Sequence, residues 1–167
     1  MILLLHNIRS VHNVGSMFRT ADAAGVSRII LSGYTPTPLD RFNQPRKDFT
    51  KVSLGAEKTV PWIYTKNLSA TISKLKSQGA LLLALEQDPR SVSLFDWRPP
   101  EHYLKTHTRQ DAVGEAELVL LVGNEVRGIS KPFLAKCDTI LEIPMRGKKE
   151  SLNVAVATGV ALFALMR

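Results

Sequence analysis

The carboxyl-terminal stretch IPMRGKKESLNVAVATGVALFALMR, residues 143–167, joins two segments of opposite character. Its first part, Ile143–Glu150, is polar and rich in cations, so it is expected to be a loop. From Ser151, the expected N-cap, the sequence predicts a helix that is apolar on nearly every face. A helix without a polar face must be buried all round, and the run Leu152–Met166 is shorter than the roughly 20 residues of a membrane span. The helix is therefore expected to pack on the protein's own sheet, and the pattern leaves open whether a second subunit covers its other side.

Length and composition describe a globular chain with an excess of positive charge. At 167 residues, with 44% hydrophobic and 22% charged residues, the chain is expected to form one domain, residues 1–167, without a membrane segment. The formal net charge of +7 favours a polyanionic partner such as a nucleic acid. The single cysteine, Cys137, excludes an internal disulfide framework and fits a cytoplasmic location.

Unbroken apolar runs alternate with helical patterns along the chain. Such runs are typical of strands that are buried on both faces of a parallel sheet. The predicted strands are Ile2–Leu5, Ser27–Ser32, Trp62–Thr65, Ala80–Leu85, Leu118–Val122 and Thr139–Ile143. Besides the carboxyl-terminal helix, the predicted helices are Val14–Ala24, Leu68–Ser77 and a short one that ends at Lys136. This alternation predicts an α/β fold with a parallel sheet.

Two segments between these elements are expected to be irregular. Residues 33–61 interleave cations with aromatics, notably Arg41, Arg46 and Lys47 with Phe42 and Phe49. This stretch is a candidate RNA-contacting surface, because cations hold phosphates and aromatic rings stack on unpaired bases. A solvated loop whose aromatics lie in the core is an equally open alternative. Residues 86–117 show no interpretable pattern, and we predict no metal site there or elsewhere.

Polar clusters follow several of the predicted strands. The clusters are Asn13, Gly15 and Arg19 after the first strand, Gly123, Asn124 and Glu125 after Leu118–Val122, and Ser151 and Asn153 after the last strand. The carboxyl ends of parallel strands meet at one edge of a sheet, where ligands bind in open α/β folds. The clusters are therefore expected to form a ligand site.

The first cluster has two interpretations. Asn13 is the expected N-cap of the helix that Gly25 closes. Gly15 would bare the backbone in the first turn and Arg19 would lie one turn above it, which suits an anionic ligand. A solvated ion pair between Arg19 and Asp22 is the alternative.

The glycines match no common nucleotide-binding or hydrolase motif. Gly123–Ser130 reads G-x-x-x-x-G-x-S, but Ile129 stands where a phosphate-binding loop has its lysine, which argues against nucleotide hydrolysis. No G-x-G-x-x-G follows the first strand and no G-x-S-x-G is present, which argues against a dinucleotide site and a nucleophile elbow.

Three segments, NVGSMFRTAD (13–22), LVGNEVRGIS (121–130) and IPMRGKKESLNVAVA (143–157), together resemble the motifs of the SpoU (TrmH-type) family of the SPOUT superfamily. The members of that family are S-adenosylmethionine-dependent RNA ribose 2′-O-methyltransferases. The resemblance spans nearly the whole chain and implies an α/β SPOUT fold with a carboxyl-terminal trefoil knot, which no periodicity predicts. It also implies a homodimer formed through the carboxyl-terminal helix, with Ala161 on the side that faces the partner.

The resemblance assigns roles to individual residues. S-adenosyl-L-methionine would lie in the knot, against Leu85, Glu86, Gly123, Asn124, Ile143, Met145, Ser151 and Leu152. The catalytic group would consist of Asn13, Arg19, Glu125, Ser151 and Asn153. RNA would contact Arg9, Arg19, Arg41, Arg46, Lys47, Arg127, Arg146 and Lys148. No metal is expected, because the positive charge of the sulfonium already activates the methyl group.

The resemblance does not name the RNA. Many relatives carry an additional RNA-binding domain or helical extensions. This chain is expected to bind RNA with its single domain and its dimer partner, which favours tRNA over rRNA. The pair Val126-Arg127 replaces a smaller, uncharged pair of many members. Two alternatives remain open: a non-catalytic RNA-binding dimer with the same fold, and an enzyme that methylates a base.

Overall fold

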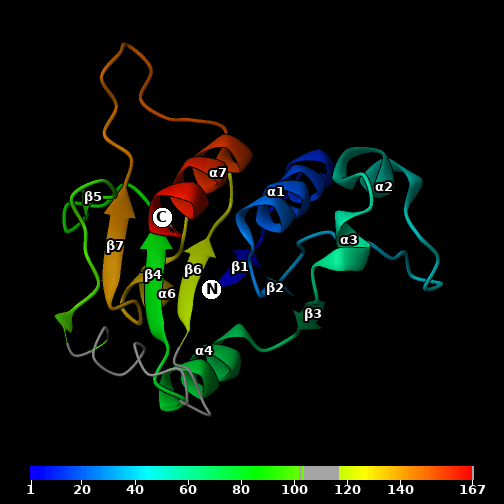
Figure 1. The fold of residues 1–167 in the computed structure, drawn as a ribbon, viewed down its shortest axis with the longest axis horizontal. Helices are drawn as coiled ribbons and strands as arrows, with labels where there is room; N and C mark the ends of the chain where they lie inside the picture. The colour runs from blue at the N-terminus through cyan, green and yellow to red at the C-terminus, as the bar shows by residue number, and fades with distance from the viewer. Residues whose placement is uncertain (102, 104–116, 167) are drawn as a thin grey trace.

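The computed structural model of the chain describes residues 1–101, 103 and 117–166, which form a parallel sheet with helices on both faces (Figure 1). The sheet has seven strands in the order β3-β2-β1-β6-β4-β7-β5, and all neighbouring strands pair in parallel. The strands are β1 Ile2–His6, β2 Arg28–Ser32, β3 Trp62–Thr65, β4 Leu81–Leu85, β5 Val92–Ser93, β6 Leu118–Val122 and β7 Thr139–Glu142. The predicted α/β fold with a parallel sheet is confirmed, whereas β5 lies in a stretch for which no strand was predicted.

The central strands carry core side chains on both faces. In β1, Leu3 and Leu5 belong to one buried cluster, while Ile2 and Leu4 belong to a second cluster. Successive side chains along a strand point to opposite faces, which explains this division. β1 pairs with β2 on one side and with β6 on the other, so it lies in the middle of the sheet. The prediction that this run is buried on both faces is confirmed.

Helices cover both faces of the sheet. They are α1 Val11–Ala24, α2 Lys47–Ser53, α3 Ala56–Thr59, α4 Leu68–Ser77, α6 Lys131–Leu134 and α7 Val154–Leu165. Helices α1 and α7 lie side by side on one face, with α2 and α3 next to α1 (Figure 1). Helices α4 and α6 supply apolar side chains to the cluster on the other face. The strands β4, β6 and β7 therefore end at an edge that α1, α7 and the loop 143–153 border.

Helix α1 begins earlier than predicted. Its N-cap is Ser10, whose hydroxyl accepts a hydrogen bond from the backbone N–H of Asn13 at 3.2 Å. The prediction that Asn13 caps this helix is therefore wrong, and its side chain is free for other contacts. The helix ends at Gly25 as predicted, with φ of 76°, a left-handed conformation that glycine adopts without steric cost.

Gly15 serves helix packing rather than ligand binding. It is buried, and a Cβ at this position would lie 3.1 Å from Cβ of Val52 and 3.2 Å from the carbonyl oxygen of Phe49. The missing side chain thus lets α2 approach α1 closely. The hypothesis that Gly15 bares its backbone to an anionic ligand is wrong, because α2 occupies that space.

The segment 33–61 is only partly irregular, since it contains α2 and α3. The two phenylalanines of this segment behave differently. Phe49 is fully buried and packs edge-to-face on Phe18 of α1, with ring centroids 5.2 Å apart. Phe42 is 66% exposed. The core interpretation of these aromatics therefore holds for Phe49, and the surface interpretation holds for Phe42.

Helix α7, in contrast to α1, begins later than predicted, because Asn153 rather than Ser151 is its N-cap. The side-chain oxygen of Asn153 accepts hydrogen bonds from the backbone N–H groups of Ala155 at 2.9 Å and Val156 at 3.4 Å. In the middle of the helix, a Cβ on Gly159 would lie 3.4 Å from Cγ2 of Thr20. The predicted close contact at Gly159 is present, and its partner is α1.

The two sides of α7 have different environments. Thr158, Ala161 and Leu162 are buried against the protein's own core. Exposed apolar side chains form an outer stripe away from this buried side: Val156 and Phe163 on the helix, Leu152 just before its N-cap and Met166 at its C-cap. The expectation that the helix is buried all round does not hold in the single chain, and the expectation that Ala161 faces a partner is wrong.

Candidate active site

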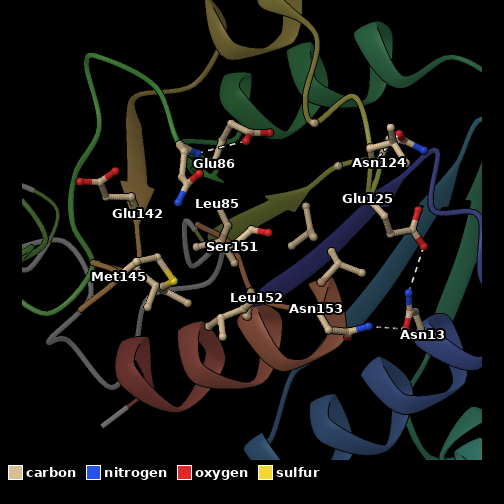
Figure 2. Close-up of a pocket in the computed structure, with 18 residues that line it drawn as sticks. Asn13, Leu85, Glu86, Asn124, Glu125, Glu142, Met145, Ser151, Leu152 and Asn153 are labelled. Carbon is tan, nitrogen blue, oxygen red and sulfur yellow. Dashed lines mark hydrogen bonds between the residues drawn. The ribbon is translucent and has the colours of Figure 1, made fainter. Parts of the chain in front are cut away.

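A cavity of about 360 Å³ lies where β4, β6 and β7 end, between α1 and the loop 143–153 (Figure 2). All residues predicted to bind the cofactor line this cavity: Leu85, Glu86, Gly123, Asn124, Ile143, Met145, Ser151 and Leu152. Asn13, Glu125 and Asn153 of the predicted catalytic group line it as well. The fold thus brings the three polar clusters to one place at the carboxyl edge of the sheet.

Glu125, Asn13 and Asn153 form a hydrogen-bonded chain along the rim of the cavity (Figure 2). The side-chain amide of Asn13 donates to Oε1 of Glu125 at 3.0 Å, and the side-chain amide of Asn153 donates to Oδ1 of Asn13 at 3.2 Å. The carboxylate of Glu125 also accepts from the backbone N–H groups of Arg9 at 2.9 Å and Ser10 at 3.1 Å. The chain therefore ties the loop after β6 to the first residues of α1 and α7.

These contacts set the charge of Glu125. Burial by itself would raise the pKa of its carboxyl group, but hydrogen bonds from the backbone N–H groups of Arg9 and Ser10 and the side chain of Asn13 outweigh it. The net pKa lies below its ordinary value, so the group is ionised near neutral pH. An ionised carboxylate at the start of α1 also interacts favourably with the helix dipole.

Asn124 organises the loop that carries Glu125. Its side-chain oxygen accepts from the backbone N–H groups of Val126 at 3.0 Å and Arg127 at 2.7 Å. Its side-chain nitrogen donates to the carbonyl oxygen of Asn7 at 2.9 Å and to the hydroxyl of Tyr34 at 2.8 Å. Asn124 therefore connects the loop after β6 to the segments that follow β1 and β2.

Glu86 closes the same loop from the side of β4. Its Oε2 accepts a hydrogen bond from the backbone N–H of Ile129 at 2.7 Å. Gly128 has φ of 64°, and a Cβ there would collide with the carboxylate of Glu86. At the other end of the loop, a Cβ on Gly123 would lie 2.9 Å from the carbonyl carbon of Gly128. The glycines that resemble a phosphate-binding loop thus serve the close folding of this segment.

The loop 143–153 forms the outer wall. The side-chain amide of Gln87 donates to the carbonyl oxygen of Glu150 at 2.7 Å, which fixes the loop to the segment after β4. Ser151 follows at the mouth of the cavity and is exposed. In the part of the chain that the structure describes, no hydrogen bond involves its hydroxyl, so this group is available to a ligand.

Several lining residues were not predicted, namely Gln87, Val122, Val126, Gly128, Glu142, Val154 and Ala157. Most of them lie within two positions of a predicted residue in the sequence. Closeness in the sequence to a predicted residue could therefore have identified them. Asn7 and Tyr34, which hold Asn124, were also missed. Asn7 directly follows β1, where the rule that ligand sites gather at strand ends would have found it.

Arg19 lies outside the cavity. It is exposed on α1, six residues beyond Asn13, which corresponds to about 9 Å along a helix axis. Its predicted alternative partner, Asp22, accepts a hydrogen bond from the hydroxyl of Thr59 at 2.6 Å instead. Among residues 1–101, 103 and 117–166, Arg19 takes part in no ion pair.

The other cations predicted to contact RNA lie in three places. Arg9 and Arg127 are exposed beside Glu125, and Arg146 and Lys148 are exposed on the loop 143–153. Arg41 and Arg46 line a second, more open cavity next to β2 and β3, and Lys47 follows directly. Of these, Arg46 forms an ion pair with Asp48 at 2.8 Å, so part of its charge is compensated.

Two further observations concern ligands and membranes. Among the described residues, no group of three or more histidine, cysteine, aspartate or glutamate side chains could hold a metal ion. Within the same residues, no helix has the length and apolar character needed to cross a membrane.

The parallel strands β4, β6 and β7 end together at one cavity. This arrangement defines an α/β protein with a small-molecule site at the carboxyl edge of its sheet. Its sequence matches the SpoU rRNA Methylase family over residues 1–163, and the chain belongs to this family. It is 32% identical to the 23S rRNA (guanosine-2′-O-)-methyltransferase RlmB of Ralstonia nicotianae, over 100% of this chain and 58% of that protein. The chain thus spans less than three fifths of the length of the curated relatives that it matches.

Solved structures share the fold. The AdoMet-bound rRNA methyltransferase from Sinorhizobium meliloti is 28% identical with a TM-score of 0.79, over 98% of this chain and 54% of that one. A structure from work on the 2-OH methylation of C/U34 on tRNA is also 28% identical, with a TM-score of 0.69, over 97% of this chain and 91% of that one. The predicted family and the predicted α/β architecture are therefore confirmed.

Proposed function

We propose that this protein transfers a methyl group from S-adenosylmethionine to a ribose 2′-hydroxyl of RNA. The observation that carries the proposal is the cavity at the sheet edge, where a hollow with both apolar and polar walls adjoins the hydrogen-bonded chain of Glu125, Asn13 and Asn153. Membership of the SpoU rRNA Methylase family supports the same reaction. The AdoMet-bound structure from Sinorhizobium meliloti supports the choice of cofactor.

The residues of the cavity fit S-adenosylmethionine in size and charge. A volume of about 360 Å³ lies in the range of small-molecule sites. Ile143, Met145 and Leu152 offer apolar surface for an adenine ring. The described lining residues include Glu86, Glu125 and Glu142 but no lysine or arginine, which favours a cationic ligand. When bound, S-adenosylmethionine supplies an electrophilic methyl group on a positively charged sulfur.

The residues of the rim would align the ribose rather than act as bases. Glu125 is ionised, but its oxygens already accept hydrogen bonds from Arg9, Ser10 and Asn13, so its role is to position Asn13. Asn13 and Asn153 present fixed amide groups at the cavity, and the hydroxyl of Ser151 is placed to contact the reacting groups. Alignment of nucleophile and methyl group is the main demand of such a displacement.

Arg19 has a different proposed role. An arginine is effectively always protonated, so it is a poor general base. We assign it to the phosphate next to the reacting ribose, where its charge would also stabilise negative charge that develops on the 2′ oxygen. Its exposure on α1, outside the cavity, fits contact with a large substrate.

The class of RNA stays general in this proposal. The preference for tRNA over rRNA that the sequence suggested receives no support from the curated relatives, whose names specify 23S rRNA. Among the similar structures, some concern rRNA and others tRNA. We therefore propose RNA as the substrate without choosing between them.

We also propose that the outer stripe of α7 is the subunit contact of a homodimer, and that the loop 143–153 belongs to a trefoil knot. Exposed apolar side chains repeated along one side of a helix are typical of a surface that another chain covers. Leu152 belongs both to this stripe and to the cavity wall, so dimer formation and cofactor binding would be coupled. The knot rests on the family resemblance.

Calorimetric titration with S-adenosylmethionine tests the enzyme directly. Binding is expected, and no heat at high micromolar cofactor would leave only the non-catalytic RNA-binding alternative. Nuclease digestion and mass spectrometry of the modified RNA then separate ribose from base methylation. A 2′-O-methyl group blocks alkaline cleavage at its own linkage, whereas a methylated base leaves that linkage sensitive. Mapping 2′-O-methyl sites in total RNA from a strain without the protein would identify the RNA.

A further inference from the structure

The second cavity differs in character from the first. Its volume is about 560 Å³, and it lies between the ends of β2 and β3 and the segment 33–46. Three aromatic side chains on its wall are unusually open: Tyr34 is 57% exposed, Phe42 66% and Tyr64 43%. Arg41 and Arg46 line the same hollow. Solvent-exposed rings beside guanidinium groups are the combination with which proteins bind single-stranded nucleic acid.

The two tyrosine rings of this cavity are held in position by their hydroxyl groups. The hydroxyl of Tyr64 donates to the carbonyl oxygen of Gly33 at 2.6 Å, and the hydroxyl of Tyr34 accepts from the side chain of Asn124 at 2.8 Å. The guanidinium of Arg41 stacks over the ring of Phe42, 4.7 Å from its centroid. Fixed rings lose little conformational entropy when a ligand stacks on them.

Most polar side chains of this cavity are engaged within the protein. Oδ1 of Asp40 accepts from the backbone N–H groups of Phe42 at 2.8 Å and Gln44 at 2.9 Å, which shapes the turn that presents Phe42. The hydroxyl of Thr37 donates to the carbonyl oxygen of Leu39 at 2.6 Å. Stacking tolerates any base, whereas base identity is read by free hydrogen-bonding groups. The cavity therefore suits stacking more than base reading.

We propose that this cavity binds an unpaired nucleobase of the RNA substrate on the rings of Phe42 and Tyr34, with the adjoining phosphate on Arg41. This inference rests on the proposed function and deepens it. It names a single-stranded nucleotide near the methylated one as a requirement of the substrate, and assigns that nucleotide a place on the protein.

Tyr34 connects the second cavity to the active site. Its ring lines the second cavity, while its hydroxyl contacts Asn124, which lines the first. Asn124 precedes Glu125, whose carboxylate holds Asn13. A base stacked on Tyr34 thus lies next to the loop that positions the rim of the active site, so its nucleotide would be a near neighbour of the reacting ribose.

The test uses a short single-stranded RNA that contains one 2-aminopurine, a base whose fluorescence changes on stacking, and the full chain. Wild-type protein is expected to bind it and to change its emission. Phe42→Ala should weaken binding about tenfold and remove the emission change, since stacking on an aromatic contributes this much per base. Phe42→Trp should restore both. Phe95→Ala is the matched control, because Phe95 is 43% exposed and follows β5 at the opposite edge of the sheet.

Each outcome bears on one proposal. If Phe42→Ala binds the probe as Phe95→Ala does, with the same emission change, the nucleobase subsite is wrong. The subsite is equally contradicted if the wild type prefers the probe annealed to its complement, in which the base is not free. These results are separate from the reaction itself. If the wild type binds no S-adenosylmethionine and methylates no RNA, the proposed function fails, whatever the probe shows.

Discussion

The carboxylate of Glu125, in the loop after β6, accepts a hydrogen bond from the side-chain amide of Asn13 on α1 at 3.0 Å. The two residues are far apart in the sequence, and no local pattern predicts their contact. The same carboxylate binds the free backbone N–H groups at the start of α1. One charged group therefore stabilises a helix end and holds a residue on the rim of the first cavity at the same time.

Glu125→Gln tests the value of that charge. The substitution keeps the shape of the side chain but weakens charge-assisted hydrogen bonds, and it should lower the free energy of unfolding near neutral pH by about 1 kcal/mol. The pKa of Glu125 is lower in the folded protein than its ordinary value of 4.5. Stability from this group is therefore present above that value and is lost as the pH falls through the folded pKa.

Urea denaturation at a series of pH values between about 3 and 7 checks this sign. The wild type should lose stability below the ordinary pKa more steeply than Glu125→Gln does. Parallel curves for the two proteins would contradict the role of the ionised carboxylate.

Asn153 has two functions that can be separated. It caps α7 through its side-chain oxygen and contacts Asn13 through its side-chain nitrogen. Asn153→Ala should cost about 1 kcal/mol of stability because the cap is lost. Asn153→Ser keeps a capping oxygen and should retain most stability, yet both variants should transfer methyl groups slowly, since neither reaches Asn13. Full activity of Asn153→Ser would show that the contact with Asn13 is dispensable.

Arg19→Lys and Arg19→Ala test the phosphate role. Both should bind S-adenosylmethionine like the wild type by calorimetry, because Arg19 lies outside the cavity. Methyl transfer should fall in both, with only partial recovery in the lysine variant, since lysine keeps the charge but loses the planar fork. If lysine restores most of the rate, the bidentate geometry is not required.

Phe163→Glu tests the outer stripe of α7. Phe163 is 57% exposed in the single chain, so the substitution should leave the fold intact while preventing dimer formation. Light scattering is expected to show a monomer, and S-adenosylmethionine should bind more weakly because Leu152 is shared by stripe and cavity. Ile63→Glu, an exposed position on the edge strand β3, is the control and should stay dimeric. A monomeric Phe163→Glu variant with normal cofactor affinity would contradict the coupling.

Local sequence patterns predicted most elements and missed details that depend on neighbours. The run LVLLV of β6 is apolar at every position, which is typical of a central parallel strand, and the structure confirms it. The predicted N-cap of α1, Asn13, is wrong because Ser10 is an equally good N-cap residue. Only the path of the chain after β1 selects Ser10. Gly15 was misread because its reason, the approach of α2, comes from a distant segment.

The candidate site shows the same division. The residue types of the three motifs and their place after strands are properties of the sequence, and they sufficed to predict much of the lining of the first cavity. The position of Arg19 outside that cavity and the contact of Tyr34 with Asn124 were not predictable in this way. Both depend on how helices and loops are rotated and packed against one another.

The sequence by itself determined the parallel α/β fold, the family and many residues that line the first cavity, because apolar runs, helix periodicity and motif residues are local properties of the chain. The tertiary structure alone decided which face of α7 is covered by the protein's own core and which carries the outer stripe. A helix that is apolar on all sides contains no sequence signal for this choice. The tertiary packing of Ala161 and Leu162 in the core next to α1 and the sheet decides which face is buried. Phe163 is left facing away from that core.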